Sequence, residues 1–331
     1  MGKKSLALNL LVSLAAIVSI MIIAEVAMRF AWEMGGWVRR PIYQKSNNPF
    51  LRYELVPGSS HGQVTINSQG FRGREYQINK PKGVFRIAMI GDSETLSFLL
   101  KEDETLAAQL EKALNARGAA EDYEVLNFGV EGYCTLQELE LLKAKALKFN
   151  PDLIILNYCL NDPEPGEYYL NKNFLMRHSA LARYISYRIK KGMIRRERKK
   201  LGISNELENY NYYYQPRYFD QVKSAILQMA STAKSRGNKL VVVIFPTSST
   251  QVKDFKENYP YKHLHKKLLD IDTGEIVFID LIDEFNRLGI TPKGASINYA
   301  YDESHKNPET LKVSADYIAA ILNTRGIIKI R

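Results

Sequence analysis

A serine at the end of an apolar run is the first feature of this sequence that could do chemistry. Arg86–Ser97 reads RIAMIGDSETLS, so the hydrophobic residues stop at Gly91, Asp92 and Ser93. Either the chain only turns a corner between a strand and a helix here, or it presents the serine hydroxyl for nucleophilic attack. Such a hydroxyl needs a base within about 2.6–3.2 Å, so a suitably placed histidine decides between the two interpretations.

Three further polar clusters stand out along the chain. They are Asn127–Gly129, Asn161–Asp162 and Tyr301–Asn307, and the last contains Asp302 and His305. Each cluster alone is common by chance. Ligands of open parallel sheets bind at the carboxyl ends of the strands, and the first two clusters directly follow apolar runs. The occurrence of all the clusters in one chain therefore favours a functional site.

The elements that position these clusters follow from the hydrophobic pattern. Short runs rich in Val, Ile, Leu and Phe alternate with helical patterns, which is typical of strands buried on both faces of a parallel sheet. This alternation predicts an α/β fold with helices on both faces of the sheet. The predicted strands are 85–90, 123–128, 153–158, 240–245 and 276–281, and the predicted helices are about 104–117, 135–148, 217–236 and 307–323.

The ordered clusters resemble the four sequence blocks of the SGNH hydrolases, also called GDSL esterases. Ser93, Gly129 and Asn161 match the first three blocks, and Asp302 with His305 matches the fourth. The resemblance covers roughly residues 83–325. It implies a flavodoxin-like three-layer α/β/α sandwich with a parallel sheet, and serine-hydrolase activity.

The resemblance also implies a role for each matched residue. Ser93 is the expected nucleophile, His305 the general base, and Asp302 the residue that orients the imidazole and stabilises its cation. The expected oxyanion donors are the backbone N–H groups of Ser93 and Gly129 and the side-chain amide of Asn161. Asp92 and Asp162 are expected to support the site.

This chain departs from the family pattern at two positions. Glu94 follows the serine where Leu or Ile is usual, and Cys159 stands where the third block usually has glycine. Glu94 removes no catalytic atom, but it places a carboxylate beside the nucleophile. Cys159 and Cys134 follow adjacent predicted strands; we favour two separate buried thiols over a disulfide between them.

No metal or cofactor is expected. His263 and His265 lie two residues apart on a predicted helix, where their side chains point in different directions. Glycine-rich phosphate-binding loops of the Walker and dinucleotide types are absent from the sequence. We assign no catalytic role to the four histidines other than His305, which are His61, His178, His263 and His265.

The first residues of the chain predict a membrane anchor. Lys3 and Lys4 precede an apolar run from Leu6 to Ala24, whose nineteen residues would span roughly 28 Å as a helix. A cleaved signal peptide and a buried core helix are the alternatives. The expected organisation is an anchor at 1–32, an extended arm with short strands at 33–82, and a hydrolase-like domain at 83–331 with a basic helical insertion at 163–215.

The insertion carries most of the net charge. Residues 171–201 contain eleven Lys or Arg and one acid, a net charge of +10 that equals the net charge of the whole chain. Leu181, Ile185, Ile189 and Met193 recur every four residues, which predicts an amphipathic helix. It is either a solvated helix packed on the domain or a surface for anionic lipid or polysaccharide. Nucleic acid is not expected as a partner.

These observations lead to one preferred function and two alternatives. Asn67–Gly73 resembles a sequence found in membrane-anchored bacterial members of the family, many of which are associated with cell-envelope polysaccharides. The preferred function is an O-acyl (acetyl) esterase that acts on such a polysaccharide outside the cytoplasmic membrane. The alternatives are an O-acetyltransferase that uses the same triad, and a non-catalytic polysaccharide-binding or assembly protein.

Overall fold

The computed structural model describes residues 3–35, 42–116, 122–164, 179–249, 251–271, 273–298, 300 and 302–328. They belong to two compact units. The first unit comprises Met1–Lys45 and Leu170–Ser204, and the second comprises Ser46–Tyr169 and Asn205–Arg331. Tyr301, His178 and residues 171–178 of the predicted basic segment lie outside the described residues.

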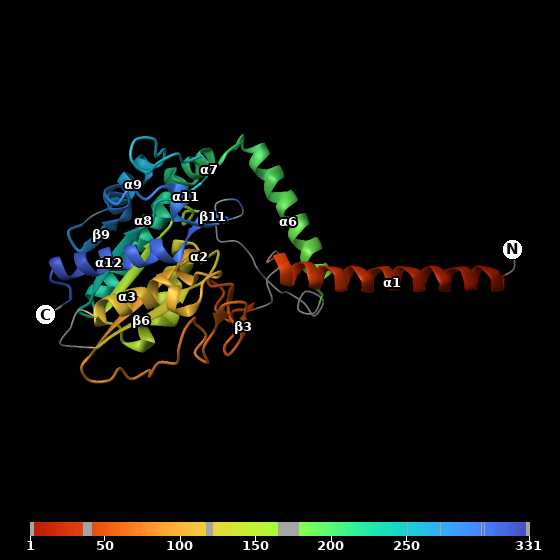
Figure 1. Ribbon diagram of the computed structural model, residues 1–331, viewed down its shortest axis with the longest axis horizontal. Coiled ribbons are helices and arrows are strands. Elements are labelled where there is room, and N and C mark those ends of the chain that lie inside the picture. The colour runs from red at the N-terminus through yellow and green to blue at the C-terminus, as the bar shows by residue number, and fades with distance from the viewer. Residues whose placement is uncertain are drawn as a thin grey trace. The chain divides into compact units, whose positions relative to one another are not determined.

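A five-stranded parallel sheet forms the centre of the second unit (Figure 1). Its order is β6-β5-β7-β8-β9. Nearly all side chains of the inner strands are buried, as expected for continuous apolar runs. The strands are β5 (Val84–Gly91), β6 (Asp122–Gly129), β7 (Leu153–Tyr158), β8 (Lys239–Ile244) and β9 (Ile276–Asp280). Each predicted strand is present, with its ends within one residue of the prediction.

Helices cover both faces of this sheet. The chain passes from β5 through α3 (Leu106–Asn115) to β6 in one direction, and from β6 through α4 (Thr135–Ala144) to β7 in the other. Because such crossovers are right-handed, α3 and α4 lie on opposite faces. Helix α12 (Pro308–Thr324) packs beside α3, and α8 (Pro216–Lys234) packs beside α4. This arrangement confirms the predicted three-layer α/β/α fold.

Shorter elements complete the second unit. Strands β3 and β4 pair antiparallel, as do β10 and β11. The short strands are β2 (Tyr53–Leu55), β3 (Ser60–His61), β4 (Val64–Thr65), β10 (Ser296–Asn298) and β11 (Asp302–Lys306). The short helices are α2 (Ser93–Leu96), η1 (Glu102–Glu104), η2 (Ala146–Phe149), α7 (Glu206–Tyr213), α9 (Lys262–Leu269), α10 (Leu281–Arg287) and α11 (Pro292–Ala295).

Residues 46–82, which fall in the predicted arm, belong to the second unit. Phe71 is buried, and its ring centroid lies 4.6 Å from that of Phe128 and 5.2 Å from that of Phe149. Asn67 shapes the turn before it, because its Oδ1 accepts the N–H groups of Gln69 and Phe71 at 3.0 and 3.2 Å. This part of the arm is therefore packed onto the sheet unit.

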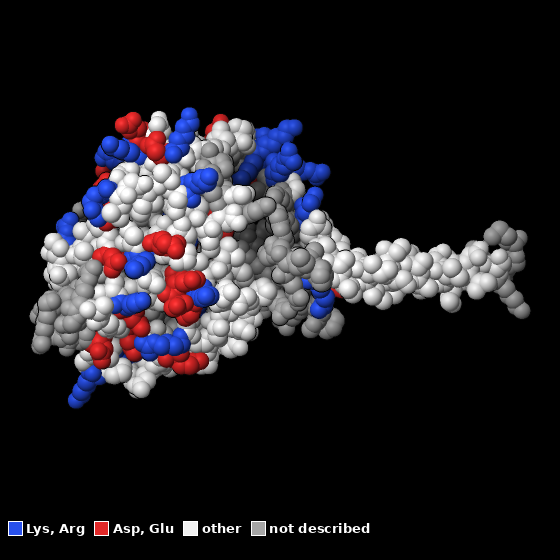
Figure 2. Space-filling model, viewed as in Figure 1, with Lys and Arg blue, Asp and Glu red and all other residues white. Residues whose placement is uncertain are grey.

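The first unit contains two long helices, α1 (Lys3–Gly35) and α6 (Ala180–Lys200), and a short strand, β1 (Tyr43–Lys45). Residues Ala7–Arg29 of α1 are long and apolar enough to cross a membrane, with a mean hydropathy of 2.6. This agrees with the predicted anchor, although a signal sequence has the same length and composition. Lys and Arg gather over α6, whereas acids and bases are interspersed over the visible face of the sheet unit (Figure 2).

The tyrosine-rich stretch that follows α6 is packed inward in part. Tyr210 and Tyr214 are buried, and the hydroxyls of Tyr214 and Tyr158 lie 2.9 Å apart. The rings of Tyr210 and Tyr214 therefore contribute to the core of the second unit.

Candidate active site

Ser93 lies at the point where β5 gives way to α2. Asp92 begins this helix, and its Oδ1 accepts the backbone N–H of Glu94 at 3.0 Å. Gly91 fits here because a Cβ would lie 2.2 Å from Thr95 Oγ1 and 2.9 Å from Asn157 O. The chain therefore turns sharply between β5 and α2, and Ser93 is half-buried at the carboxyl edge of the sheet.

His305 and Asp302 reach Ser93 from β11, far along the chain. His305 Nε2 lies 2.8 Å from Ser93 Oγ, and Nδ1 lies 2.7 and 2.8 Å from the two carboxylate oxygens of Asp302. Since a carboxylate only accepts hydrogen bonds, Nδ1 carries the proton and Nε2 accepts from the serine hydroxyl. The structure therefore brings together the three residues that the sequence placed in a triad.

The charges around His305 favour its protonated form. Burial lowers the pKa of the imidazole, but the hydrogen bond and charge of Asp302 outweigh burial, and Glu94 and Asp92 add to the effect, so the pKa of His305 is raised. Burial also opposes ionisation of Asp302, yet the contact with His305 lowers the pKa of that carboxyl. Asp302 stays ionised and holds the ring in place.

Asn161 is oriented by Asp92. Its Nδ2 donates to Asp92 Oδ2 at 2.9 Å, so one of its two N–H groups is used and the other can point toward a ligand. Asp92 is almost fully buried and serves both α2 and Asn161. It therefore links the position of Ser93 to the position of the amide.

Asp162 follows Asn161 in the sequence and is buried, as is the nearby carboxylate of Glu138. Thr135 Oγ1 donates to Asp162 Oδ2 at 3.4 Å, and both carboxylate oxygens of Glu138 are buried without a hydrogen-bond partner among the described residues. Burial and the nearby charges of Glu138 and Asp92 raise the pKa of Asp162, and burial and the charge of Asp92 raise the pKa of Glu138.

Gly129 has a packing role that the sequence did not reveal. A Cβ there would lie 2.2 Å from the backbone nitrogen of Leu96, so only glycine lets α2 approach β6 so closely. Its own N–H donates to Asn127 Oδ1 at 2.9 Å. The donor expected for the oxyanion is therefore already hydrogen-bonded, and its predicted role stays a prediction.

Gly132 was missed by the sequence analysis. It lies in the turn between β6 and α4, has a φ of +72°, and is half-buried. Among the described residues its N–H has no acceptor. The signal was present in the sequence, since Gly129 and Gly132 both follow the second strand, but the pattern does not say which N–H is left unpaired.

Glu94 is explained by its contact with β11. It is buried, and its Oε1 accepts the backbone N–H of Lys306 at 3.0 Å. Burial raises the pKa of this carboxyl, while the charges of Lys306 and His305 oppose that shift. Glu94 thus forms a hydrogen bond to β11, the strand that carries His305.

The similarity of this chain to known proteins is limited to distant structural matches. No family model and no curated protein matches the sequence. The lipase/acylhydrolase from Enterococcus faecalis shares 15% identity over 75% of this chain and 98% of its own, with a TM-score of 0.44. An acetyl xylan esterase shares 14% identity over 72% and 100%, with a TM-score of 0.45. A two-domain esterase active on acetylated mannans shares 12% over 73% and 49%, also with 0.45.

His263 and His265, to which the sequence assigned no catalytic role, have partners outside this site. Buried His265 is held between Asp280 Oδ2 at 2.9 Å and the Tyr259 hydroxyl at 3.0 Å, whereas His263 contacts Asn211. The two histidines therefore have different partners. No cluster of three or more His, Cys, Asp or Glu suited to a metal ion occurs in the described ranges. Cys134 and Cys159 form no disulfide.

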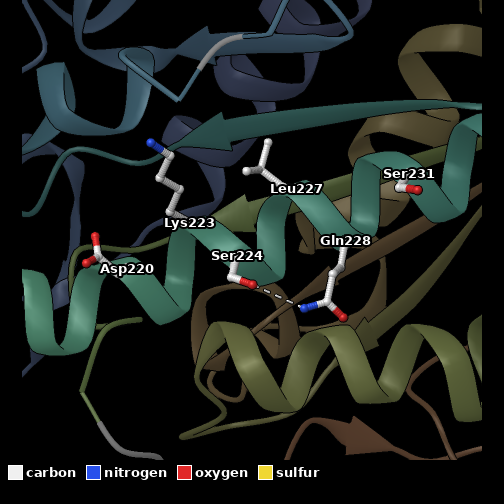
Figure 3. A pocket seen from close by; sticks show the side chains of 6 residues that line it. All are labelled: Asp220, Lys223, Ser224, Leu227, Gln228 and Ser231. Atoms are coloured by element: carbon white, nitrogen blue, oxygen red, sulfur yellow. Dashed lines mark hydrogen bonds between the residues drawn. The ribbon is translucent and has the colours of Figure 1, made fainter.

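A shallow hollow lies along α8 (Figure 3). It contains none of the predicted site residues, and its polar side chains include Gln228, which donates to Ser224 at 3.3 Å. All of its lining residues come from one helix: Asp220, Lys223, Ser224, Leu227, Gln228 and Ser231.

Proposed function

We propose that this chain is an SGNH-type serine esterase that hydrolyses its substrate through an acyl-serine intermediate. The observation that carries the proposal is the 2.8 Å contact between Ser93 Oγ and His305 Nε2, with Asp302 bound to the other ring nitrogen. This contact joins residues 212 positions apart in the sequence. A hydroxyl, a base and a carboxylate in this order are what nucleophilic attack on an ester requires.

Each step can be assigned to an atom. Ser93 Oγ forms a bond to the ester carbonyl carbon while its proton passes to His305 Nε2. The tetrahedral intermediate then breaks its bond to the alcohol, which takes that proton from His305. Water repeats the sequence on the acyl-serine and releases the carboxylic acid. Asp302 stabilises the imidazolium in both halves of the reaction.

The oxyanion needs donors that are not already occupied. The Ser93 N–H at the start of α2 and the second N–H of Asn161 meet this condition. We propose the N–H of Gly132 as the third donor, in place of the Gly129 N–H that Asn127 occupies. Loss of one such donor typically lowers the rate by about 10²–10³.

The proposed substrate is an O-acylated, most simply O-acetylated, polysaccharide of the cell envelope. Two features support it. The first is the predicted anchor in α1, and the second is the pair Lys3 and Lys4 before its apolar span, which favours an N-terminus inside and the sheet unit outside the cytoplasmic membrane. Fusions of alkaline phosphatase to the C-terminus test this orientation, because the phosphatase is active only outside the cytoplasm.

The experiment uses the full-length chain purified in detergent. We expect it to release acetate from p-nitrophenyl acetate and from an O-acetylated polysaccharide, and mass spectrometry of the quenched reaction to find the acetyl group on Ser93. Acetyl groups that appear on an added unacetylated polysaccharide would identify a transferase instead. Polysaccharide binding without any acetyl-serine would identify the non-catalytic alternative and overturn the proposal.

Replacement of Glu94 by glutamine should shift the pH dependence of this activity. His305 must be neutral to accept the serine proton, so kcat/KM falls as the pH drops through the pKa of His305, which is raised above its ordinary value. Glu94 contributes to that rise, so Glu94→Gln should move the acidic limb of the profile to lower pH. The amide oxygen can still accept from Lys306 N, so the alkaline plateau should change by less than about threefold.

The matched control is Asp103→Asn, which removes an exposed carboxylate on η1. We expect its pH profile to coincide with that of the wild type. Two results would show that Glu94 does not act on His305. One is an acidic limb of Glu94→Gln at the same pH as that of the wild type, and the other is an equal shift of the acidic limb in Asp103→Asn.

A further inference from the structure

Glu25 joins the two helices of the first unit. It lies near the end of the candidate membrane span, and its carboxylate accepts hydrogen bonds from the start of α6. The donors are Ser179 Oγ at 2.8 Å, Ala180 N at 2.9 Å and Leu181 N at 2.9 Å. Ser179 Oγ in turn accepts from Ala182 N at 3.0 Å. One carboxylate from α1 therefore completes the first turn of α6.

Apolar packing strengthens this joint. Ala180 is fully buried, and Met28 and Tyr184 pack against it. Arg29 donates to Glu25 at 2.6 Å from one turn further along α1. An ionised side chain in the centre of a bilayer is costly, whereas a carboxylate with four donors at the end of the span suits the boundary with water. The start of α6 is thus tied to the level at which α1 leaves the hydrocarbon.

The surface of α6 matches such a boundary. Ile185, Ile189 and Met193 form a stripe at four-residue spacing, and they are 49%, 59% and 64% exposed. The last turn and a half of the helix is basic, with Glu197 as its only acid, and every residue there is exposed. These basic residues are Arg195, Arg196, Arg198, Lys199 and Lys200. An apolar stripe beside a concentrated positive charge is typical of helices that lie in a membrane interface.

We propose that α6 lies along the anionic headgroups of the leaflet in which α1 ends, with Glu25 fixing its N-terminus there. The apolar stripe then enters the acyl boundary and the basic end contacts lipid phosphates. An anionic polysaccharide would satisfy the charges but would leave the exposed stripe in water, so the observations favour lipid. The proposal rests on the proposed membrane insertion of α1 and is independent of the esterase chemistry.

Hydrogen–deuterium exchange of the full-length chain in lipid nanodiscs tests this proposal. Discs of phosphatidylcholine alone are compared with discs that also contain phosphatidylglycerol. We expect amides of residues 185–200 to exchange at least about tenfold more slowly in the anionic discs, since each basic residue near such a surface strengthens binding severalfold. Glu25→Gln should speed exchange of the Ala180 and Leu181 amides in both kinds of disc.

Two variants test the two components of the surface. The first combines Ile189→Gln with Met193→Gln, and the second replaces four basic residues of α6, Arg195, Arg196, Lys199 and Lys200, by glutamine. Both should lose the protection that anionic lipid gives. The matched control replaces four exposed lysines of the second unit, Lys82, Lys112, Lys223 and Lys312, by glutamine and should keep it.

Equal exchange of α6 in both kinds of disc would overturn the proposal. Protection of α6 in phosphatidylcholine discs on addition of a soluble anionic polysaccharide would also overturn it, as would an equal loss of protection in the control variant. Extraction of the chain by alkaline carbonate would show that α1 is not inserted and would overturn it as well. Hydrolysis of p-nitrophenyl acetate, measured on the same discs, reports separately on the proposed esterase.

Discussion

Ser93→Ala should lower kcat/KM for p-nitrophenyl acetate by about 10⁴–10⁶-fold in the full-length protein, with no loss of thermal stability. The expected loss is large because alanine has no atom that can form the acyl bond, and only the oxyanion donors and binding remain. Stability should be kept because alanine retains Cβ and removes only the hydroxyl of a half-buried serine, whose hydrogen-bond partner is His305.

A nearby serine provides the matched control. Ser97 lies four residues on, where its hydroxyl donates to the carbonyl of Glu94 at 2.7 Å. Ser97→Ala should cost about 1 kcal/mol of stability and change kcat/KM by less than about threefold.

A double variant tests whether the triad acts as one unit. His305→Ala removes the base, so it should lose activity on the scale of Ser93→Ala, and the combination of both should be no worse than either alone. Additive losses would mean that the two residues act in separate steps, and undiminished activity in Ser93→Ala would place the nucleophile elsewhere.

The strands could be predicted because short-range patterns determine them, whereas the roles of the triad residues were implied by the resemblance of four sequence blocks to a known family. The ends of β5 to β9 were predicted to within one residue from continuous apolar runs. Such runs occur because both faces of these strands are buried, so successive residues are hydrophobic. The carboxyl ends of parallel strands share one edge, so polar clusters there were expected to meet. Ser93 and Asn161, both tied to Asp92 or its helix, followed from this rule.

The remaining features depend on side chains that meet across long sequence separations. Nothing in the local pattern shows that Glu94 binds the backbone of Lys306, 212 residues further along the chain. The contact of Glu25 with Ala180 likewise joins residues 155 positions apart. From the sequence alone, Glu94 and Glu25 cannot be distinguished from acids that are exposed to solvent.

The Asn67–Gly73 stretch shows the same limit, and its arginine has the largest expected effect on stability. Arg72 has no exposed side-chain surface. Its Nη1 donates to the carbonyls of Leu96 and Ser97 at 2.5 and 2.6 Å, and its Nη2 donates to the carbonyl of Leu100 at 2.6 Å. Leu96 is the last residue of α2, Ser97 caps it, and Leu100 lies three residues further on. One guanidinium therefore holds the carboxyl end of the helix that begins at Ser93.

Arg72→Met should lower the free energy of unfolding by about 3–5 kcal/mol. Methionine fills much of the space, but it leaves the buried carbonyls without donors. It also removes the hydrogen bond from Arg72 Nε to Glu102 Oε2, which is 2.8 Å long. For a unit of this size we expect the melting temperature of the full-length chain to fall by roughly 10 °C. The folded fraction should also lose kcat/KM, because α2 is no longer held at its carboxyl end.

Arg74→Met is the control that separates this clamp from a general loss of positive charge. Arg74 is two residues away, its side chain is 53% exposed, and it contacts Glu111 and Glu124 at 3.5 and 3.8 Å. Exposed ion pairs of this kind contribute at most about 1 kcal/mol, so its melting temperature should change by only a few degrees. Equal losses in the two variants would contradict the clamp. A loss confined to Arg72→Met would show that a residue of the predicted arm positions the helix that carries Ser93.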